Sequence, residues 1–373
     1  MPNQKHILII YPVDFNQEAN LGIKAKMEGQ GEAFAELGYV VSQAFIRNKK
    51  CIFKIENKES VLSFNISSKL AKYQSLYTAL TNKLTIITYD LVYIRHLVHT
   101  RSLLSFLKAV DKSKTKIIYE FPTYPYYSEW YKWWQRLLLI EDSLVRSRCE
   151  IFIDLIIHFG GYDGNLKAKE ITNGVLLKTV EIFKNQVVPN NNTFRLVAVG
   201  RWEYWHGLER ILYGMMDCTE NIALDIIGHG PKLGFYKKIV ATNNNIKNKV
   251  VFHGPLHGKL LERIMANANL GVGTLGLHRK DVMMDSSLKH RMYCAFGLPF
   301  VFAGEDANFN IDLPFIFRVP VGESKVNLDS LIGEYTNKKA HNPNGLAKNN
   351  IITYATKNLS WKSRIIEILR EVD

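Results

Sequence analysis

The stretch at residues 196–212, LVAVGRWEYWHGLERIL, constrains the fold of this chain most strongly. Its apolar run from Leu196 to Val199 predicts a buried strand, which ends at Gly200. After a short aromatic loop, apolar residues recur at helical spacing from about Gly207 onward. The stretch therefore predicts strand, loop and helix, and in a parallel α/β sheet such a loop lies at the edge where ligands bind.

This loop has properties that suit a phosphate group. The helix after it offers unpaired backbone N–H groups and the positive end of its dipole. Gly200 lets the backbone approach a ligand closely, and Arg201 adds a forked cation that matches phosphate oxygens. Many strand-to-helix turns carry a glycine and an arginine without binding anything, so the loop alone leaves phosphate binding and an ordinary turn both open.

The same order of strand and helix recurs along the chain, which at 373 residues is long enough for two domains. The alternation predicts a parallel sheet with helices on both faces in the first half and a second βαβ series in the second half. Because the asparagine-rich segment 179–193 indicates a linker, we predict domains at 1–178 and 179–355. The predicted strands cover 7–10, 39–41, 91–94, 117–119, 151–153, 196–199, 223–227, 250–252, 270–273 and 300–302.

Composition narrows the class of protein. With 47% hydrophobic and 22% charged residues, the chain is typical of a globular protein. No apolar run reaches the roughly 18 residues of a membrane-spanning helix and no signal peptide is evident, so we expect a cytoplasmic protein. The four cysteines lack metal-ligand or redox spacing, which favours reduced thiols. The net charge of +13 favours an anionic partner, such as nucleic acid, a membrane surface or an anionic substrate.

Glu120 follows the predicted strand 117–119 and opens a loop with two prolines and several aromatic residues, EFPTYPYY. A carboxylate in an aromatic-lined cleft could have a raised pKa and transfer protons, or it could hold a sugar hydroxyl. It could equally cap a neighbouring helix or pair with a lysine. The sequence leaves these alternatives open.

Two other features of the first half also allow two interpretations. Gly22 stands at the turn into the first predicted helix, close to Lys24 and Lys26, which indicates either a phosphate-binding turn or a simple turn. The helical pattern at 129–148 carries three tryptophans beside four cations, as membrane-interface helices do. Its acidic residues nearly balance those cations, so tryptophans that pack in the core are favoured.

Five short motifs follow one another through the region 170–305. They are Thr172–Val175, Gly200-Arg201 with His206-Gly207, Ile226–Pro231, Val251–Gly254, and Leu288–Tyr293 with Gly297-Leu298-Pro299. In combination and in this order they resemble the GT-B glycosyltransferases of family 4, retaining enzymes that use nucleotide-activated sugars. The first half resembles a bacterial branch of surface-polysaccharide transferases through Gly22 with its lysines and the loop that begins at Glu120.

This resemblance implies an α/β architecture, GT-B, of two Rossmann-like domains that face each other across a cleft, with a helix at 356–373 that crosses back to the first domain. It also implies that Arg201 and Lys289 grip the donor diphosphate. Together with Glu120, these two cations are the candidate catalytic residues. The candidate donor-binding residues are Gly200, Arg201, His206, Gly228, His229, Gly230, Pro231, Asp285, Ser287, Leu288, Lys289 and Met292, and those on the acceptor or phosphate side are Gly22, Lys24 and Tyr124.

The chemistry of the leaving group agrees with this assignment. A departing nucleoside diphosphate gains negative charge, which fixed cations and helix amino ends stabilise without a metal. The sequence contains no Asp-x-Asp motif, so we expect neither a metal nor another cofactor. In retaining enzymes of this fold the acceptor enters on the face that the diphosphate leaves, so the resemblance implies no protein nucleophile.

The chain departs from the family pattern at three positions. Met284 and Met292 stand where members carry a pair of glutamates that contact the sugar and the ribose. Asp285 could replace the first glutamate, whereas nothing nearby replaces the second. His206 replaces the usual lysine and is positive only part of the time near neutral pH. A non-catalytic GT-B subunit that binds glycan or a partner transferase therefore stays open as the alternative.

The sequence thus predicts a hexosyltransferase with a UDP- or GDP-linked donor and a glycan or lipid-linked acceptor, acting in bacterial surface polysaccharide synthesis. The basic segments 47–58, within a predicted hairpin at 45–58, and 101–116 would face anionic lipid or acceptor at the inner face of the cell membrane. Nucleic acid is not an expected partner, because the lysines are spread along the chain without a recognised binding module.

Overall fold

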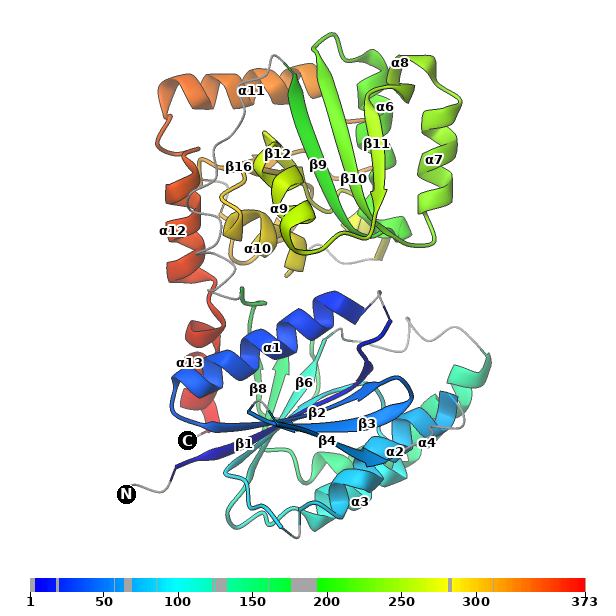
Figure 1. Ribbon diagram of the computed structural model, residues 1–373, viewed down its shortest axis with the longest axis vertical. Helices are drawn as coiled ribbons and strands as arrows, with labels where there is room; N and C mark the ends of the chain where they lie inside the picture. Colours follow the sequence, from blue (N-terminus) through cyan, green and yellow to red (C-terminus); the bar gives the residue numbers. More distant parts are fainter. Residues whose placement is uncertain are drawn as a thin grey trace. The chain divides into compact units, whose positions relative to one another are not determined.

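The computed structural model in Figure 1 describes residues 4–17, 20–56, 58–63, 69–84, 86–122, 124, 133–159, 161–175, 193–280, 284–310 and 312–372. The chain divides into two compact units, Met1–Ile171 with Trp361–Asp373 and Thr172–Ser360. The predicted boundary at 178 and almost all of the predicted linker lie outside the described residues.

The first unit is built on a mainly parallel sheet. Its described strands follow the order β4-β3-β2-β1-β5-β6-β7-β8, and every neighbouring pair from β2 to β8 is parallel. The central strands are buried along nearly their whole length, which is typical of a parallel sheet covered by helices. The strands are β1 (His6–Asp14), β2 (Val40–Arg47), β3 (Lys50–Ile55), β4 (Lys58–Ser63), β5 (Leu91–Arg95), β6 (Lys116–Phe121), β7 (Leu155–His158) and β8 (Ala168–Glu170).

One edge of this sheet is antiparallel, which corrects the prediction of a parallel sheet in the first half. β2 and β3 form the predicted hairpin, and β4 adds to β3 in the antiparallel direction. Asn48 and Lys49 join β2 to β3 with φ angles of 52° and 58°. Two successive residues with positive φ form the hairpin turn whose twist matches that of the strands, and asparagine adopts this conformation readily.

Helices cover both faces of the sheet (Figure 1). On β1, Ile7 and Ile9 belong to one hydrophobic cluster, and Leu8 and Ile10 belong to another, because successive side chains of a strand point to opposite faces. α1 (Leu21–Glu36) and α13 (Trp361–Val372) complete the first cluster. The second cluster includes side chains of α2 (Lys69–Thr81), α3 (Arg101–Ala109) and α4 (Trp133–Glu150).

The helix at the carboxyl end belongs to the first unit, as the fold prediction required. Trp361 packs against Gly29 of α1, where a Cβ atom would come within 2.5 Å of the indole. Ile365 and Ile368 of α13 are fully buried in the same cluster. A glycine on α1 therefore makes room for the largest side chain of α13.

The strand predicted at 151–153 is wrong. α4 continues to Glu150, and the N–H groups of Phe152 and Ile153 donate to the carbonyl groups of Cys149 and Glu150 in a turn. The strand of this region is β7, which begins at Leu155. Two apolar runs stand close together here, and the hydrogen bonds that end α4 decide which of them joins the sheet.

The second unit is built on a parallel sheet with the strand order β11-β10-β9-β12-β14-β16 among the described residues. All of its strand pairs are parallel. Its edge strand β16 was missed from the sequence. The strands are β9 (Phe194–Arg201), β10 (Ile222–His229), β11 (Val250–Gly254), β12 (Leu270–Val272), β14 (Phe300–Phe302) and β16 (Ile316–Arg318), and a separate short pair joins β13 (Met284–Asp285) to β15 (Glu305–Asp306).

Helices again cover the sheet of the second unit (Figure 1). None of the helices that the structure describes, in either unit, is both long and apolar enough to cross a bilayer. The predicted α/β fold class is confirmed, since each unit pairs a parallel-rich sheet with helices. The helices of this unit are α6 (Glu209–Asp217), α7 (Leu233–Ala241), α8 (Asn244–Lys247), α9 (Gly258–Ala266), α10 (Leu288–Ala295), α11 (Leu328–His341) and α12 (Lys348–Asn358).

The ends of β9 and β10 approach each other too closely for a side chain. A Cβ atom on Gly228 would lie 1.9 Å from the carbonyl oxygen of Gly200, and Gly228 has a φ of 117°. Both the space and the backbone conformation therefore require glycine.

We predict that Gly228→Ala lowers the free energy of unfolding by roughly 2 kcal/mol or more, because the added Cβ must displace the neighbouring strand. Gly234→Ala in α7 is the matched control, since a Cβ there meets nothing within 4 Å. The control should leave stability unchanged or raise it by up to about 1 kcal/mol. Urea unfolding measures both variants, and equal midpoints would contradict the prediction.

Candidate functional site

In the second unit, the site forms where β9 and β10 end side by side. The two strands pair in parallel register, with Gly228 opposite Gly200 and His229 opposite Arg201. The Trp202 N–H donates to the His229 carbonyl at 2.6 Å, which extends the pairing beyond the strands. The two loops therefore leave the carboxyl edge of the sheet together, the edge at which ligands bind in parallel α/β folds.

Three predicted donor-site residues meet at this edge. A Cβ on Gly200 would lie 3.3 Å from the Lys289 ammonium nitrogen and 3.9 Å from His206 Nε2. Lys289 is the second residue of α10 and is nearly buried, with its ammonium 5.3 Å from the centre of the Trp202 ring. The ammonium of a lysine in the first turn of α10 thus lies beside a backbone that carries no side chain.

His206 is held as a neutral hydrogen-bond donor. Its Nδ1 accepts a hydrogen bond from the Glu203 N–H at 2.9 Å, so Nε2 carries the proton of the neutral ring. Burial lowers the pKa of His206 well below its usual value, and the nearby Lys289 and Lys280 cations lower it further. His206 is therefore not the part-time cation that the sequence predicted.

Arg201 lies at the surface of the same edge. Its side chain is 54% exposed, and its guanidinium pairs with Glu203 at 2.9 Å. To reach a ligand, Arg201 would have to break its ion pair with Glu203. The loss of stability would be small, because exposed ion pairs contribute at most about 1 kcal/mol. Of the two predicted diphosphate-binding cations, Lys289 is therefore fixed and Arg201 is adjustable.

Buried polar contacts hold the amino end of α10. Arg291 forms a bidentate ion pair with Asp306, one bond of which measures 2.6 Å, and His290 Nδ1 lies 3.0 Å from the same carboxylate. Just before the helix, the Asn173 N–H donates to Ser286 Oγ at 2.8 Å. These contacts fix where Lys289 points. Asp306 was missed from the sequence, because no motif marks a residue that serves only to hold others.

The remaining predicted donor residues have varied surroundings. Leu288 is exposed, Ser287 is nearly buried directly before α10, and Gly230 has a φ of 141° and lies against Trp202. Met292 packs against the hydrophobic core, while Met284 is exposed. The backbone of Asp285 pairs in β13, and its side chain lies outside the described residues.

In the first unit, Glu120 lies at the centre of a buried polar network. Its carboxylate pairs with Lys26 at 2.9 Å and with Arg95 at 2.6 Å. It also accepts hydrogen bonds from Tyr93 at 2.5 Å and from Gln30 at 3.3 Å. The lysine-paired alternative is therefore the one that the structure confirms.

The charge of Glu120 follows from these partners. Burial alone would raise its pKa, but the Lys26 and Arg95 cations and the bond from Tyr93 outweigh burial and lower the pKa to about 2. The interpretation of Glu120 as a carboxyl with a raised pKa is wrong. Burial also lowers the pKa of Lys26 to about 7, against the opposing effect of Glu120.

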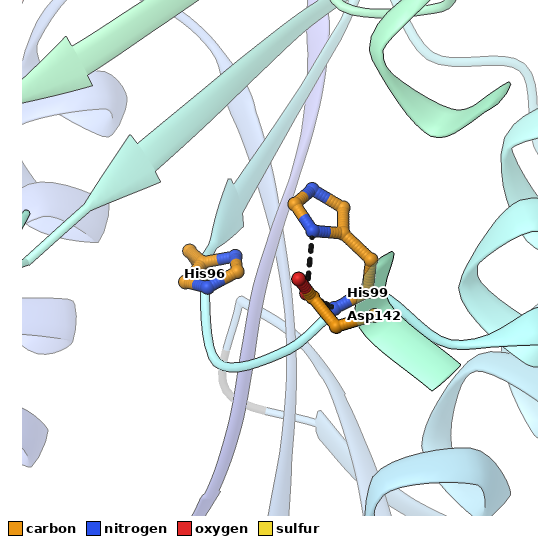
Figure 2. Close-up of side chains that lie close together, drawn as sticks. All are labelled: His96, His99 and Asp142. Atoms are coloured by element: carbon orange, nitrogen blue, oxygen red, sulfur yellow. Dashed lines mark hydrogen bonds and ion pairs between the residues drawn. The ribbon is translucent and has the colours of Figure 1, made fainter. Parts of the chain in front are cut away.

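A second buried cluster, at the end of β5, joins His96, His99 and Asp142 (Figure 2). His99 Nδ1 and the His99 N–H both lie 2.8 Å from one Asp142 oxygen, and Arg146 pairs with the other oxygen at 2.5 Å. As it stands, the cluster anchors the loop between β5 and α3. The sequence signal was two histidines three residues apart directly after a strand.

The predicted acceptor-side residues do not meet at one place. Tyr124 packs edge-on against Phe121 and Tyr162 at the end of β6. Gly22 lies in the first turn of α1, and Lys24 of the same helix lies 3.5 Å from Glu28. Lys24 lines a pocket between α1 and the sheet edge.

Sequence comparison does not place the chain in a family. No model of a known protein family matches it, and no curated protein matches it.

Comparison of structures gives a clear result. HepE from Anabaena, in complex with UDP and glucose, is 14% identical with a TM-score of 0.60, over 98% of this chain and 99% of that chain. A glycosyltransferase from Rickettsia africae is 10% identical with a TM-score of 0.64, over 99% of both chains. The catalytic domain of starch synthase IV from Arabidopsis thaliana, bound to ADP and acarbose, is 10% identical with a TM-score of 0.67, over 99% of this chain and 98% of that chain. The chain therefore has the α/β fold of the GT-B glycosyltransferases.

Proposed function

We propose that this chain is a glycosyltransferase that moves a hexose from a UDP- or GDP-linked donor to a glycan or lipid-linked acceptor in bacterial surface polysaccharide synthesis. The observation that carries the proposal is the convergence of the Lys289 ammonium and His206 Nε2 on the Gly200 backbone. An ammonium, an imidazole N–H and an open backbone in one place favour an anion such as a diphosphate. The nucleotides bound to HepE and to starch synthase IV support a nucleotide as the ligand.

The proposed reaction breaks the bond between C1 of the sugar and the diphosphate oxygen, which keeps the electron pair. Lys289 and the amino end of α10 stabilise the charge that develops on this oxygen, and His206 donates its Nε2–H. The acceptor hydroxyl bonds to C1 on the face that the diphosphate leaves, and its proton passes to the leaving oxygen. The configuration at C1 is retained, and the step uses neither a protein nucleophile nor a metal.

The non-catalytic alternative rests on the two methionines. A methionine has no carboxylate, so neither Met284 nor Met292 supplies the group that the family resemblance leads one to expect. A non-catalytic subunit that binds glycan or a partner transferase would have the same fold but would not bind the nucleotide-sugar donor. Measuring nucleotide binding therefore separates the two proposals.

We predict that the protein binds UDP or GDP without added metal and that Lys289→Ala weakens this binding about 100-fold, because a nearly buried ammonium at a phosphate is lost. Lys325→Ala is the control, since Lys325 is an exposed lysine of the same unit that pairs with Asp217. Calorimetric titration gives the affinities, and thermal melting verifies the fold. Binding that survives in Lys289→Ala would refute the role of Lys289, and no binding in the wild type would favour the non-catalytic subunit.

A second prediction concerns pH. Because the pKa of His206 is lowered below 6.5, the ring stays neutral between pH 8 and pH 6 and gains no charge as the pH falls. The affinity for UDP-glucose, whose diphosphate does not titrate in this range, should therefore stay constant. His206→Phe should weaken binding about tenfold at every pH, since it removes one donor to an anion. Affinity that rises through pH 6.5 in the wild type and not in this variant would show a cationic His206.

We also propose that the first unit associates with the inner face of the cell membrane. On α4, Leu137, Ile140 and Leu144 are 51%, 57% and 61% exposed and lie along one face of the helix. Exposed Arg136 and Arg148 flank them. An apolar stripe with cations beside it suits a bilayer that contains anionic lipid. Trp130 and the side chains of Trp133 and Trp134 lie outside the described residues.

We predict that the triple variant Leu137→Asp, Ile140→Asp and Leu144→Asp no longer sediments with vesicles of phosphatidylglycerol and phosphatidylcholine, whereas the wild type does. Carboxylates at these positions remove the apolar stripe and repel anionic lipid. Leu260→Asp is the control, because Leu260 on α9 is 62% exposed in the other unit. Equal sedimentation of wild type and triple variant would place the membrane contact elsewhere, and no sedimentation of the wild type would refute the association.

A further inference from the structure

We propose that a pocket in the first unit binds a single sugar ring that carries an anionic group, a carboxylate or a phosphate. This inference rests on the proposed function, because it assigns the pocket to the acceptor. The pocket has a volume of about 190 Å³ and lies between the first turns of α1, the end of β1 and the hairpin edge of the sheet. Drug-sized ligands occupy pockets of about 300 Å³ or more, so this pocket fits one small ring.

The floor of the pocket is a row of side chains across the sheet edge. Gln43 on β2 is opposite Lys54 on β3, and Lys54 is opposite Glu59 on β4. Residues directly opposite one another in antiparallel strands point to the same face. An amide, an ammonium and a carboxylate therefore stand in line on a sheet surface that the hairpin makes rigid.

Apolar side chains form one wall. The rings of Phe15 and Phe45 lie 5.1 Å apart with an interplanar angle of 34°, and Met27 of α1 lines the pocket beside them. Such a wall suits the C–H face of a sugar ring, which is apolar although its edge is polar. Sites for small molecules typically combine apolar walls with a few placed polar groups.

Gln43 supplies a fixed hydrogen-bond acceptor. Its side chain is 93% buried, since its exposed fraction is 7%, and its Nε2 donates to the Met27 carbonyl at 3.2 Å. Among the described residues, its Oε1 has no hydrogen-bond partner. This carbonyl oxygen can therefore accept from a hydroxyl of the ligand without breaking an existing bond.

The charges in the pocket leave one cation in excess. Arg47 forms a bidentate pair with Glu59, with distances of 2.6 and 3.4 Å, and Lys24 lies 3.5 Å from Glu28. Lys54 forms no ion pair within the part of the chain that the structure describes. Because one ammonium is uncompensated, an anionic ligand neutralises the pocket, while the two carboxylates remain acceptors for sugar hydroxyls.

The test uses the full chain and three probes, D-glucuronate, D-glucose 6-phosphate and neutral D-glucose, titrated by ligand-observed NMR. We expect the two anionic probes to bind and glucose to bind at least about fivefold more weakly, since one charge-assisted contact is missing. The anionic probe that binds with the higher affinity shows whether the pocket prefers a carboxylate or a phosphate. Equal binding of glucose, or no binding of either anionic probe, would overturn the inference.

Variants locate the binding. Lys54→Met keeps the aliphatic stem and should weaken glucuronate and glucose 6-phosphate about fivefold or more, while Lys58→Met, outside the pocket on β4, should leave both unchanged. Thermal melting shows whether each variant is folded. Unchanged affinity in Lys54→Met would overturn the assignment. Titration of the same samples with UDP and GDP tests the proposed function separately, because the nucleotide site lies in the other unit.

Discussion

The arrangement of the second unit depends on one buried ion pair, between Arg291 of α10 and Asp306 of β15. Both side chains are almost fully buried, so removing either would leave an unpaired charge, which costs about 3–5 kcal/mol. The pair shares its carboxylate with His290 and fixes α10 along its first turn. As a result, the ammonium of Lys289 lies where β9 ends, beside Gly200. The buried pair of Arg291 and Asp306 thus positions the helix that carries Lys289.

The two units use charge in different ways at the carboxyl edges of their sheets. In the first unit, Glu120 is surrounded by two cations and two neutral donors, so the network is satisfied internally. In the second, the Lys289 ammonium lies beside a neutral histidine and the Gly200 backbone, where β9 ends. An excess of positive potential in a nearly buried place favours an anion. This contrast is why we assign the nucleotide to the second unit and look for the acceptor at the hairpin edge of the first.

Much of the fold could be predicted from local patterns. The strands around Leu8, Val92, Val197 and Ile226 are apolar runs that end at glycine or polar residues, and each of them is present. Prediction from local patterns failed where two apolar runs lie close together in the sequence. The run at 151–153 has the apolar character of a strand, but the turn that ends α4 uses its backbone N–H groups. The strand β4, which adds to the predicted hairpin in the antiparallel direction, was also missed.

The sequence by itself indicated where most strands of the parallel sheets end, because apolar runs and glycine positions can be read from the local chain. The strand ends pointed to the loop after Gly200, and the resemblance to a known family added Gly228, His206 and Lys289 as expected neighbours of a ligand. The protonation states and partners of these groups were decided only by the tertiary structure. Glu120 is ionised because Lys26, Arg95 and Tyr93, distant in sequence, surround it. His206 is neutral because burial and the nearby lysines lower its pKa, and the Glu203 N–H sets which ring nitrogen carries the proton. A pKa depends on the distances to every charge nearby, and those distances exist only after the chain has folded.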